Sequence, residues 1–219
     1  PEEWSGREIR LQEVVDILTT SILMRLLENK PYGVAILAEG ILENLSREDL
    51  DALDNVERDE HGHIRLAEVN FLDILKHNLD QELQQMGVRM RLIKFVMGYE
   101  LRCAPPRAFD VEYTRTLGEA AIDFLMDGGT NAIITLQNNQ VVPIPYHEML
   151  DPVTGRTEVR MVNINSYRYQ SSYKLMARLK PEHAQDEALF ACLAALTNLT
   201  PEAFKGRFGY LAGIAPRPF

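Results

Sequence analysis

Apolar residues recur every three or four positions in three long stretches of the chain, which is the spacing of a single helix face. These stretches cover residues 7–28, 71–86 and 109–126. Gly87 and Gly128 stand where the second and third stretches would end, and glycine commonly follows the last turn of a helix. The pattern predicts an amphipathic helix in each stretch. Shorter helices are expected at residues 166–179, at 181–196 and from 201 onward.

Two short apolar runs, each placed after one of the first two helices, predict buried strands. The first run spans residues 32–37 and is followed at once by Glu39 and Gly40. The second run spans residues 88–97 and ends at Gly98. Helices that alternate with such strands are typical of α/β proteins, so we expect a parallel sheet with helices on both faces.

A β-hairpin is expected farther along the chain. Residues 131–136 and 140–144 have the composition of strands, and the polar residues 137–139 between them suit a tight turn. Pro143 indicates that the second strand is short or lies at a sheet edge, because proline has no N–H to donate to a neighbour. A further short extended run is expected at residues 158–164.

The loop after the second predicted strand gathers polar side chains. Tyr99, Glu100 and Arg102 lie within four consecutive positions together with Leu101, and two prolines follow soon after. In α/β proteins, ligands bind at the carboxyl ends of strands, in the loops that follow them. Residues 86–117 also hold six basic side chains against three acidic ones, in a chain whose net charge is −9. This basic island indicates a site for a small anion.

Composition sets outer limits on the function. Hydrophobic residues at 46% and charged residues at 25% of 219 are values of a globular protein. The acidic balance speaks against general nucleic-acid binding, and no apolar run approaches the roughly 20 residues of a membrane span. Cys103 and Cys192 do not form a disulfide framework, and with no signal peptide they favour a cytoplasmic location. The chain opens at Pro1, which leaves a natural start and a cut both open.

Three motifs resemble one family. They are the run Gly98-Tyr-Glu-Leu-Arg-Cys-Ala-Pro-Pro, the run Phe109-Asp-x-Glu-Tyr-Thr-Arg-x-Leu-Gly, and Ala38-Glu-Gly. Together they resemble the 6-phosphofructokinases (the phosphofructokinase A family), and within them the pyrophosphate-dependent branch. The resemblance covers residues 7–179 but only the C-terminal half of such an enzyme. The glycine-rich phosphoryl-donor motif, the Thr-Ile-Asp-Asn-Asp segment and the Met-Gly-Arg segment of the family are missing, so the chain is interpreted as a fragment.

The resemblance assigns roles to five residues. Arg102 matches the arginine that binds the 6-phosphate of fructose 6-phosphate, whereas spacing alone suits an ion pair with a nearby carboxylate equally well. Glu39 matches a glutamate that contacts the sugar, and its alternative role is a charge at a helix N-terminus. Tyr99 stands where ATP-dependent relatives usually carry a histidine, although its spacing alone favours packing. Glu100 and Leu101 fill the same loop, and backbone contacts are expected of them.

Some positions depart from the family pattern or carry little weight. ATP-dependent relatives have an arginine that reaches into a neighbouring subunit's site, and Ile93 occupies that position here. We expect either that Arg91 or Lys94 makes this contact instead, or that the contact is absent from this protein. His61 and His63 alone are a weak signal for a metal, because no further ligand is evident. The chain has no glycine-rich nucleotide motif of its own.

The implied reaction transfers a phosphoryl group from pyrophosphate to the 1-hydroxyl of fructose 6-phosphate, reversibly, to give fructose 1,6-bisphosphate. The family's catalytic base and its Mg²⁺ ligand belong to the missing half, so we assign no catalytic or metal residue in this chain. The implied fold is a parallel-sheet three-layer sandwich. Residues 1–102 would form the substrate lobe, 103–150 would return to the missing donor lobe, and 151–219 would add a strand and helices. A cytoplasmic homodimer is implied, without a membrane or nucleic-acid partner.

Three alternatives remain open from the sequence. One is an ATP-dependent 6-phosphofructokinase, because the residues that choose the donor are expected mostly in the missing half. Another is a non-catalytic regulatory subunit, which some members of this family have become. The third is a sugar-phosphate-binding module without an enzyme partner.

Overall fold

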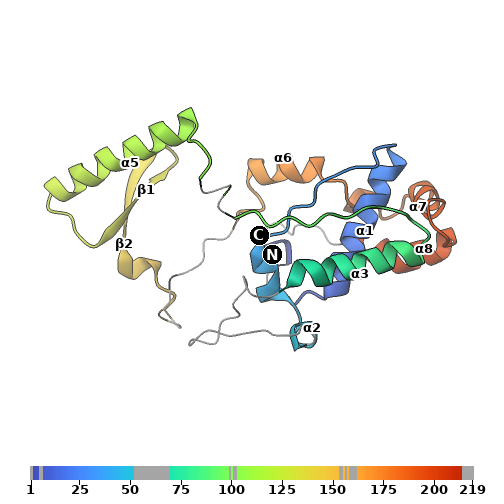
Figure 1. The fold of residues 1–219 in the computed structure, drawn as a ribbon. Coiled ribbons are helices and arrows are strands. Elements are labelled where there is room, and N and C mark those ends of the chain that lie inside the picture. The colour runs from blue at the N-terminus through green and yellow to red at the C-terminus, as the bar shows by residue number, and fades with distance from the viewer. Residues whose placement is uncertain are drawn as a thin grey trace. The chain divides into compact units, whose positions relative to one another are not determined.

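The computed structural model of the chain describes residues 2–4, 7–51, 70–98, 100, 103–152, 155, 157 and 162–213. Helices and a two-stranded antiparallel sheet make up its regular structure (Figure 1). The chain divides into two compact units, one formed by Pro1–Lys94 with Val162–Phe219 and the other by Phe95–Met161. No helix among the described residues is long and apolar enough to cross a membrane.

The first unit is helical. Its longer helices are α1 (Leu11–Leu27), α3 (Phe71–Gln85), α6 (Tyr167–Leu175), α7 (Glu187–Ala194) and α8 (Pro201–Phe208). Shorter pieces are α2 (Arg47–Asp51) and the 3₁₀ helices η1 (Glu2–Trp4), η2 (Glu39–Asn44), η5 (Pro181–His183) and η6 (Gly209–Gly213). The predicted helices at the start, middle and end of the chain are therefore confirmed, although the last three are shorter than their apolar patterns.

The core of this unit lies where the C-terminal helices cover α1 and α3. Phe190, Phe204 and Phe208 are fully buried and pack in one cluster with apolar residues of the two long helices. Phe204 and Phe208 lie with their ring centroids 4.8 Å apart. The expected apolar face of α3 is confirmed, because four apolar residues at helical spacing are buried: Phe71, Leu75, Leu79 and Leu83.

Polar contacts hold the C-terminal helices to α1 and α3. The Tyr210 hydroxyl donates a hydrogen bond of 2.7 Å to the buried carboxylate of Asp16 in α1. Arg207 donates one of 2.6 Å to the buried carboxylate of Glu82 in α3. Burial is the main cause that raises the pKa of Tyr210, and the bond to Asp16 adds to it. Buried polar groups need such partners, so these contacts specify how the helices are arranged.

Three helices end in the same local geometry. The residue after the last turn adopts a left-handed conformation in each: Asn29 after α1, Gly87 after α3 and Gly128 after α5 (Ala108–Met126), with φ of 58°, 76° and 84°. After α3, the Val88 N–H donates to the Leu83 carbonyl at 2.8 Å, which is the bond that defines a Schellman motif. The same bond type closes α1 and α5. The glycine stops expected after the second and third helices are confirmed.

The two segments predicted as parallel strands are extended but do not belong to a sheet. Within the part of the chain that the structure describes, the backbone groups of residues 33–37 and 89–97 form no hydrogen bonds. Several of their apolar side chains are exposed, with Val34 at 90% and Ile93 at 77%, whereas Leu37, Met90 and Leu92 are partly buried against the core. A strand is stabilised by the neighbour that pairs with its backbone, and the described residues provide none. The parallel sheet is therefore not seen in this structure.

Among its described residues, the second unit contains the helix α5 and the hairpin. Helix α5 contacts β1 (Ala132–Gln137), which pairs antiparallel with β2 (Gln140–Pro145), and the 3₁₀ helix η4 (Tyr146–Met149) follows. Asn138 and Asn139 form the turn with φ of 51° and 62°, the left-handed pair that a two-residue hairpin requires. The predicted hairpin and its turn are confirmed.

Candidate functional site

The loop predicted to bind the ligand follows the extended segment that ends at Gly98. Glu100 is exposed, and its carboxylate accepts a hydrogen bond of 3.0 Å from the Gly98 N–H. The carboxylate folds back on its own loop in this way. Tyr99, Leu101 and Arg102 lie outside the described residues.

The electrostatics of Glu100 follow from these backbone contacts. The N–H of Glu100 itself and then that of Gly98 donate to the carboxylate, and they hold the pKa of Glu100 below its usual range. The side chain is therefore ionised at neutral pH and can only accept hydrogen bonds. This state suits a residue that shapes the loop and does not suit a group that donates a proton.

Glu39 opens the 3₁₀ helix η2, directly after the first extended segment. Its backbone position is set by the apolar residues that follow, because Ile41, Leu42 and Leu45 are buried in the core of the first unit. Leu45 also forms a parallel bridge with Ile9, which fixes the end of η2. The structure describes the backbone of Glu39 but not its side chain.

One cation of the basic island, Lys94, is held in an ion pair. Lys94 forms an ion pair with Asp73 of α3, and the hydrogen bond from Lys94 is the main cause that lowers the pKa of Asp73. Arg107 precedes α5, and its backbone N–H donates to the Asp110 carboxylate at 2.8 Å. Of the two cations considered for a contact with a neighbouring subunit, Lys94 is thus engaged within its own unit. Arg91 makes no ion pair or hydrogen bond with the residues that the structure describes.

One buried charged cluster was not foreseen from the sequence. Arg178 donates a hydrogen bond of 2.6 Å to the Glu3 carboxylate, and the Tyr169 hydroxyl donates to the same group. Burial and then the contact with Glu3 raise the pKa of Tyr169. Tyr169 belongs to the serine- and tyrosine-rich run from Ser166 to Tyr173. The structure shows that part of this run secures η1 to the C-terminal part of the first unit.

The sequence signal for a metal rests on two histidines, which the structure does not describe. Among the described residues, no three His, Cys, Asp or Glu side chains are grouped so that they could hold a metal ion. His61 and His63 lie outside those residues. Cys103 and Cys192 are exposed free thiols.

Comparisons with known proteins place these features in context. No protein-family model matches the chain. A pyrophosphate–fructose 6-phosphate 1-phosphotransferase from Naegleria fowleri is 36% identical over 207 residues, which is 93% of this chain and 47% of that protein. A protein of the same name from Thermotoga maritima is 37% identical over 213 residues, 95% of this chain and 51% of that protein. An ATP-dependent 6-phosphofructokinase from Entamoeba histolytica is 30% identical over 118 residues, 53% of this chain and 26% of that protein.

These matches confirm the resemblance to the phosphofructokinases that the motifs predicted. Within that family, the chain is similar over nearly its whole length to part of a pyrophosphate–fructose 6-phosphate 1-phosphotransferase. It spans about half the length of the curated relatives that it matches so fully. The ATP-dependent relative from Entamoeba matches a shorter part of the chain at lower identity.

Proposed function

We propose that the complete protein transfers a phosphoryl group from pyrophosphate to the 1-hydroxyl of fructose 6-phosphate, giving fructose 1,6-bisphosphate and orthophosphate, and that it runs in both directions. The observation that carries this proposal is the match of 93–95% of the chain, at 36–37% identity, to two relatives named for that reaction. In our proposal the chain supplies the part of the enzyme that binds the sugar phosphate.

Each candidate residue has a binding role in this proposal. Arg102 pairs with the 6-phosphate, because a guanidinium forms two parallel charge-assisted bonds with phosphate oxygens. Tyr99 donates its hydroxyl to the same phosphate, and Glu39 accepts hydrogen bonds from sugar hydroxyls. Glu100 and Leu101 shape the loop, in keeping with the contact between the Glu100 carboxylate and its own loop.

The chemistry of transfer is mainly positioning and neutralisation of charge. Mg²⁺ is the proposed cofactor, and it would neutralise the charge on the transferred phosphoryl group. We place its ligands and the catalytic base in the remainder of the protein, as the resemblance to the phosphofructokinases implies. The residues of this chain hold the acceptor sugar in place and exclude other orientations.

We infer that the two extended segments become strands of a parallel sheet in the complete protein, with helices on both faces. Their unpaired backbone groups and exposed apolar side chains support this, because such edges are completed by the addition of further strands. Residues 1–102 would then belong to the substrate lobe and 151–219 would add a strand and helices. Residues 103–150 would return to the donor lobe.

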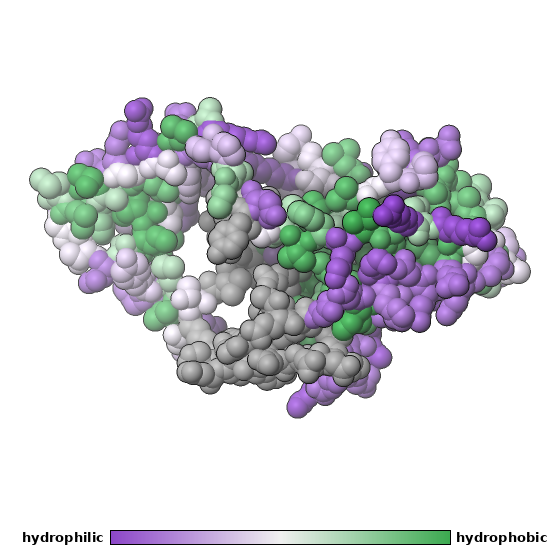
Figure 2. Space-filling model, in the orientation of Figure 1, coloured by the Kyte–Doolittle hydropathy of each residue, from purple (hydrophilic) through white to green (hydrophobic). Residues whose placement is uncertain are grey.

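Exposed apolar side chains of α5 support the last assignment. This helix of 19 residues has no buried side chain, and its exposed apolar residues are Phe109, Val111, Ile122, Leu125 and Met126. Figure 2 shows hydrophobic residues gathered on the surface of the unit that contains α5 and the hairpin. We propose that the donor lobe covers these exposed side chains.

Produced by itself, the chain of residues 1–219 is therefore expected to be inactive and to aggregate. Light scattering after size-exclusion chromatography would measure this. Replacing Ile122 and Leu125 together by glutamate should reduce the aggregation, whereas Glu119→Gln on the same helix should not. A soluble monomer with a single cooperative unfolding transition would contradict the proposal that another lobe covers α5.

We further propose a cytoplasmic homodimer with no membrane or nucleic-acid partner. Two exposed free thiols suit a reducing compartment, where disulfides are rare. The net charge of −9 opposes binding to nucleic acid, whose phosphates repel an acidic surface. The dimer is implied by the resemblance alone.

The donor assay tests the proposed function. Full-length protein with fructose 6-phosphate and Mg²⁺ should form fructose 1,6-bisphosphate rapidly with pyrophosphate and slowly with ATP. Supplied with fructose 1,6-bisphosphate and orthophosphate, it should form pyrophosphate. Efficient turnover with ATP and none with pyrophosphate would move the protein to the ATP-dependent branch. No turnover with either donor, despite binding of fructose 6-phosphate, would indicate a regulatory subunit or a binding module.

A further inference from the structure

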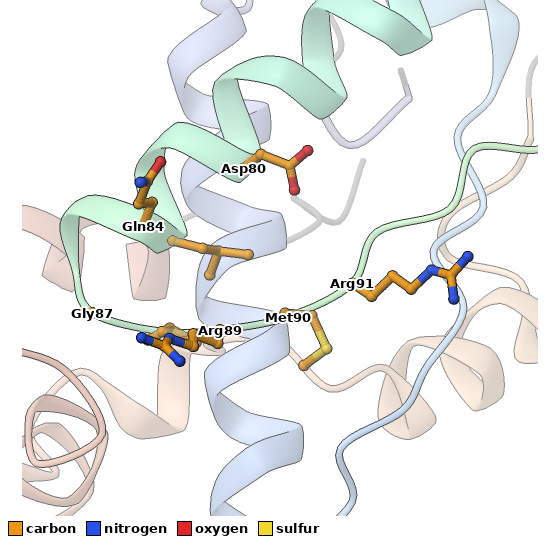
Figure 3. Close-up of a pocket in the computed structure, with 8 residues that line it drawn as sticks. Asp80, Gln84, Gly87, Arg89, Met90 and Arg91 are labelled. Atoms are coloured by element: carbon orange, nitrogen blue, oxygen red, sulfur yellow. The ribbon is translucent and has the colours of Figure 1, made fainter.

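The two extended segments that lead to the candidate site residues are held to different degrees. Gly87 turns the second segment back along α3, where the segment borders a groove that Asp80 and Gln84 also line (Figure 3). Three of its residues, at positions 88, 90 and 92, pack against the core. In the first segment, residues 32–36 are exposed, and Leu37 packs against the core as a partly buried side chain. The position of Glu39 is therefore set mainly by the residues that follow it.

The C-terminal end of η2 is fixed to the segment just before α1. The Ile9 N–H donates to the Asn44 carbonyl at 2.7 Å, and the Ser46 N–H donates to the Ile9 carbonyl at 2.8 Å. Ile9 is fully buried, and Leu45, which forms the bridge with it, is buried as well. The backbone of Asn44 is thus tied directly to the core of the first unit.

The side chain of Asn44 reaches back from this anchor to the other end of η2. Its amide Nδ2 donates to the Gly40 carbonyl at 3.1 Å, and Gly40 directly follows Glu39. The Ile41 N–H closes the same turn on the Ala38 carbonyl, also at 3.1 Å. Hydrogen bonds of 3₁₀ geometry are poorer than those of an α-helix, and such helices rarely exceed three or four residues. With six residues, η2 therefore gains from a side-chain bond that supports its first turn.

The restraint acts on the most flexible residue of this turn. Glycine has more backbone freedom than any other residue, so the carbonyl of Gly40 can reorient unless a donor holds it. A reorientation at Gly40 would move the residue before it. Groups that orient a substrate need to be held within about 0.5 Å of their productive positions. A bond that holds the Gly40 carbonyl thus also holds Glu39.

We propose that Asn44 is a positioning residue for the Glu39 carboxylate, which it holds through the Gly40 carbonyl. This inference rests on the proposed function, in which Glu39 accepts hydrogen bonds from the hydroxyl groups of the sugar. Asn44 does not touch the sugar in this proposal. It sets the place from which the carboxylate of Glu39 reaches the sugar.

Steady-state kinetics of the full-length protein test this proposal, with fructose 6-phosphate varied at saturating pyrophosphate. Asn44→Asp keeps the size of the side chain, but a carboxylate has no proton to donate to the Gly40 carbonyl. The Michaelis constant for fructose 6-phosphate should rise about fivefold, as for the loss of one hydrogen bond. The Michaelis constant for pyrophosphate should not change. Asn44→Ala, which removes the bond without adding a charge, should act in the same direction.

Asn78 provides a matched control. Its amide Nδ2 donates to the Ile74 carbonyl at 2.8 Å, which is also four residues earlier in the chain. Asn78→Asp therefore removes the same kind of bond from α3 and should leave both Michaelis constants unchanged. Circular dichroism on each variant checks that it folds.

A double-variant cycle separates positioning of Glu39 from a general structural role of Asn44. If Asn44 acts through Glu39, then Asn44→Asp should raise the Michaelis constant in the parent protein and have no further effect in Glu39→Ala. An effect of equal size in both backgrounds overturns the proposal, and so does an unchanged Michaelis constant in both Asn44 variants.

The same cycle distinguishes this inference from the proposed function. An unchanged Michaelis constant in Glu39→Ala would remove Glu39 from the sugar site, and the role of Asn44 would be lost with it. A rise in Glu39→Ala without any effect of the Asn44 variants overturns the role of Asn44 alone. Calorimetric titration with fructose 6-phosphate gives the same comparison as affinities, so the test holds for a protein that does not turn over pyrophosphate.

Discussion

Replacing Arg178 by alanine is expected to destabilise the protein by about 3–5 kcal/mol, the usual cost of removing one partner of a buried ion pair. The side chain of Arg178 is 9% exposed and that of its partner Glu3 is 11% exposed. Without the guanidinium, the Glu3 carboxylate would remain buried with only the Tyr169 hydroxyl to compensate its charge. Contacts between η1 and the C-terminal part of the first unit would then be lost.

Thermal unfolding of the full-length protein measures this effect, and hydrogen exchange would locate it. Exchange should rise in peptides that cover residues 2–4 and 167–178. The matched control is Lys30→Ala, because Lys30 and Glu28 form an ion pair in which both side chains are 47% exposed. Exposed pairs contribute about 0–1 kcal/mol, so this control should change stability little. Equal losses of stability in the two variants would show that the Arg178–Glu3 pair contributes no more than an exposed ion pair.

Replacing Arg102 by alanine is expected to weaken binding of fructose 6-phosphate by about 2–4 kcal/mol, as for a truncated charge-assisted pair. Since each 1.36 kcal/mol is a factor of ten, the Michaelis constant for this sugar should rise by about 30- to 900-fold. The reason is that the guanidinium is proposed to hold the 6-phosphate directly. Steady-state kinetics on the full-length enzyme at saturating donor would measure it.

Two further variants sharpen this test. Arg102→Lys keeps the charge but not the planar pair of donors, so it should recover only part of the affinity. Arg107→Ala removes an exposed cation from the same basic island and should change the Michaelis constant by less than about threefold, because screened surface charges contribute little. An unchanged Michaelis constant in Arg102→Ala would remove Arg102 from the site.

Elements whose hydrogen bonds close within a few residues could be predicted from the sequence. Helix α3 was expected at residues 71–86 and is observed at Phe71–Gln85, because its apolar face and the glycine stop are both local signals. The hairpin was expected for the same reason, since Asn138 and Asn139 tolerate the left-handed turn that joins its strands. The family resemblance could also be recognised from the sequence, because it rests on short motifs.

Contacts between distant parts of the chain were decided only by the tertiary structure. Glu3 and Arg178 are 175 positions apart, and no pattern marks them as partners. Asn198 reaches the end of α3 across 113 positions, where its side chain donates a hydrogen bond to the Gln85 carbonyl. A backbone must fold before such groups come within hydrogen-bonding distance, so their pairing is absent from any local window of sequence.

The same distinction between local and long-range features applies to the candidate site. The sequence by itself identified the candidate site residues, which are Glu39 and the loop of residues 98–102. It also predicted that the segments before them are apolar and extended. Only the tertiary structure decided that those segments remain unpaired in this chain and that the Glu100 carboxylate turns back onto the Gly98 N–H. The physical reason is that a strand depends on a neighbour for its hydrogen bonds, whereas a helix or a tight turn supplies its own.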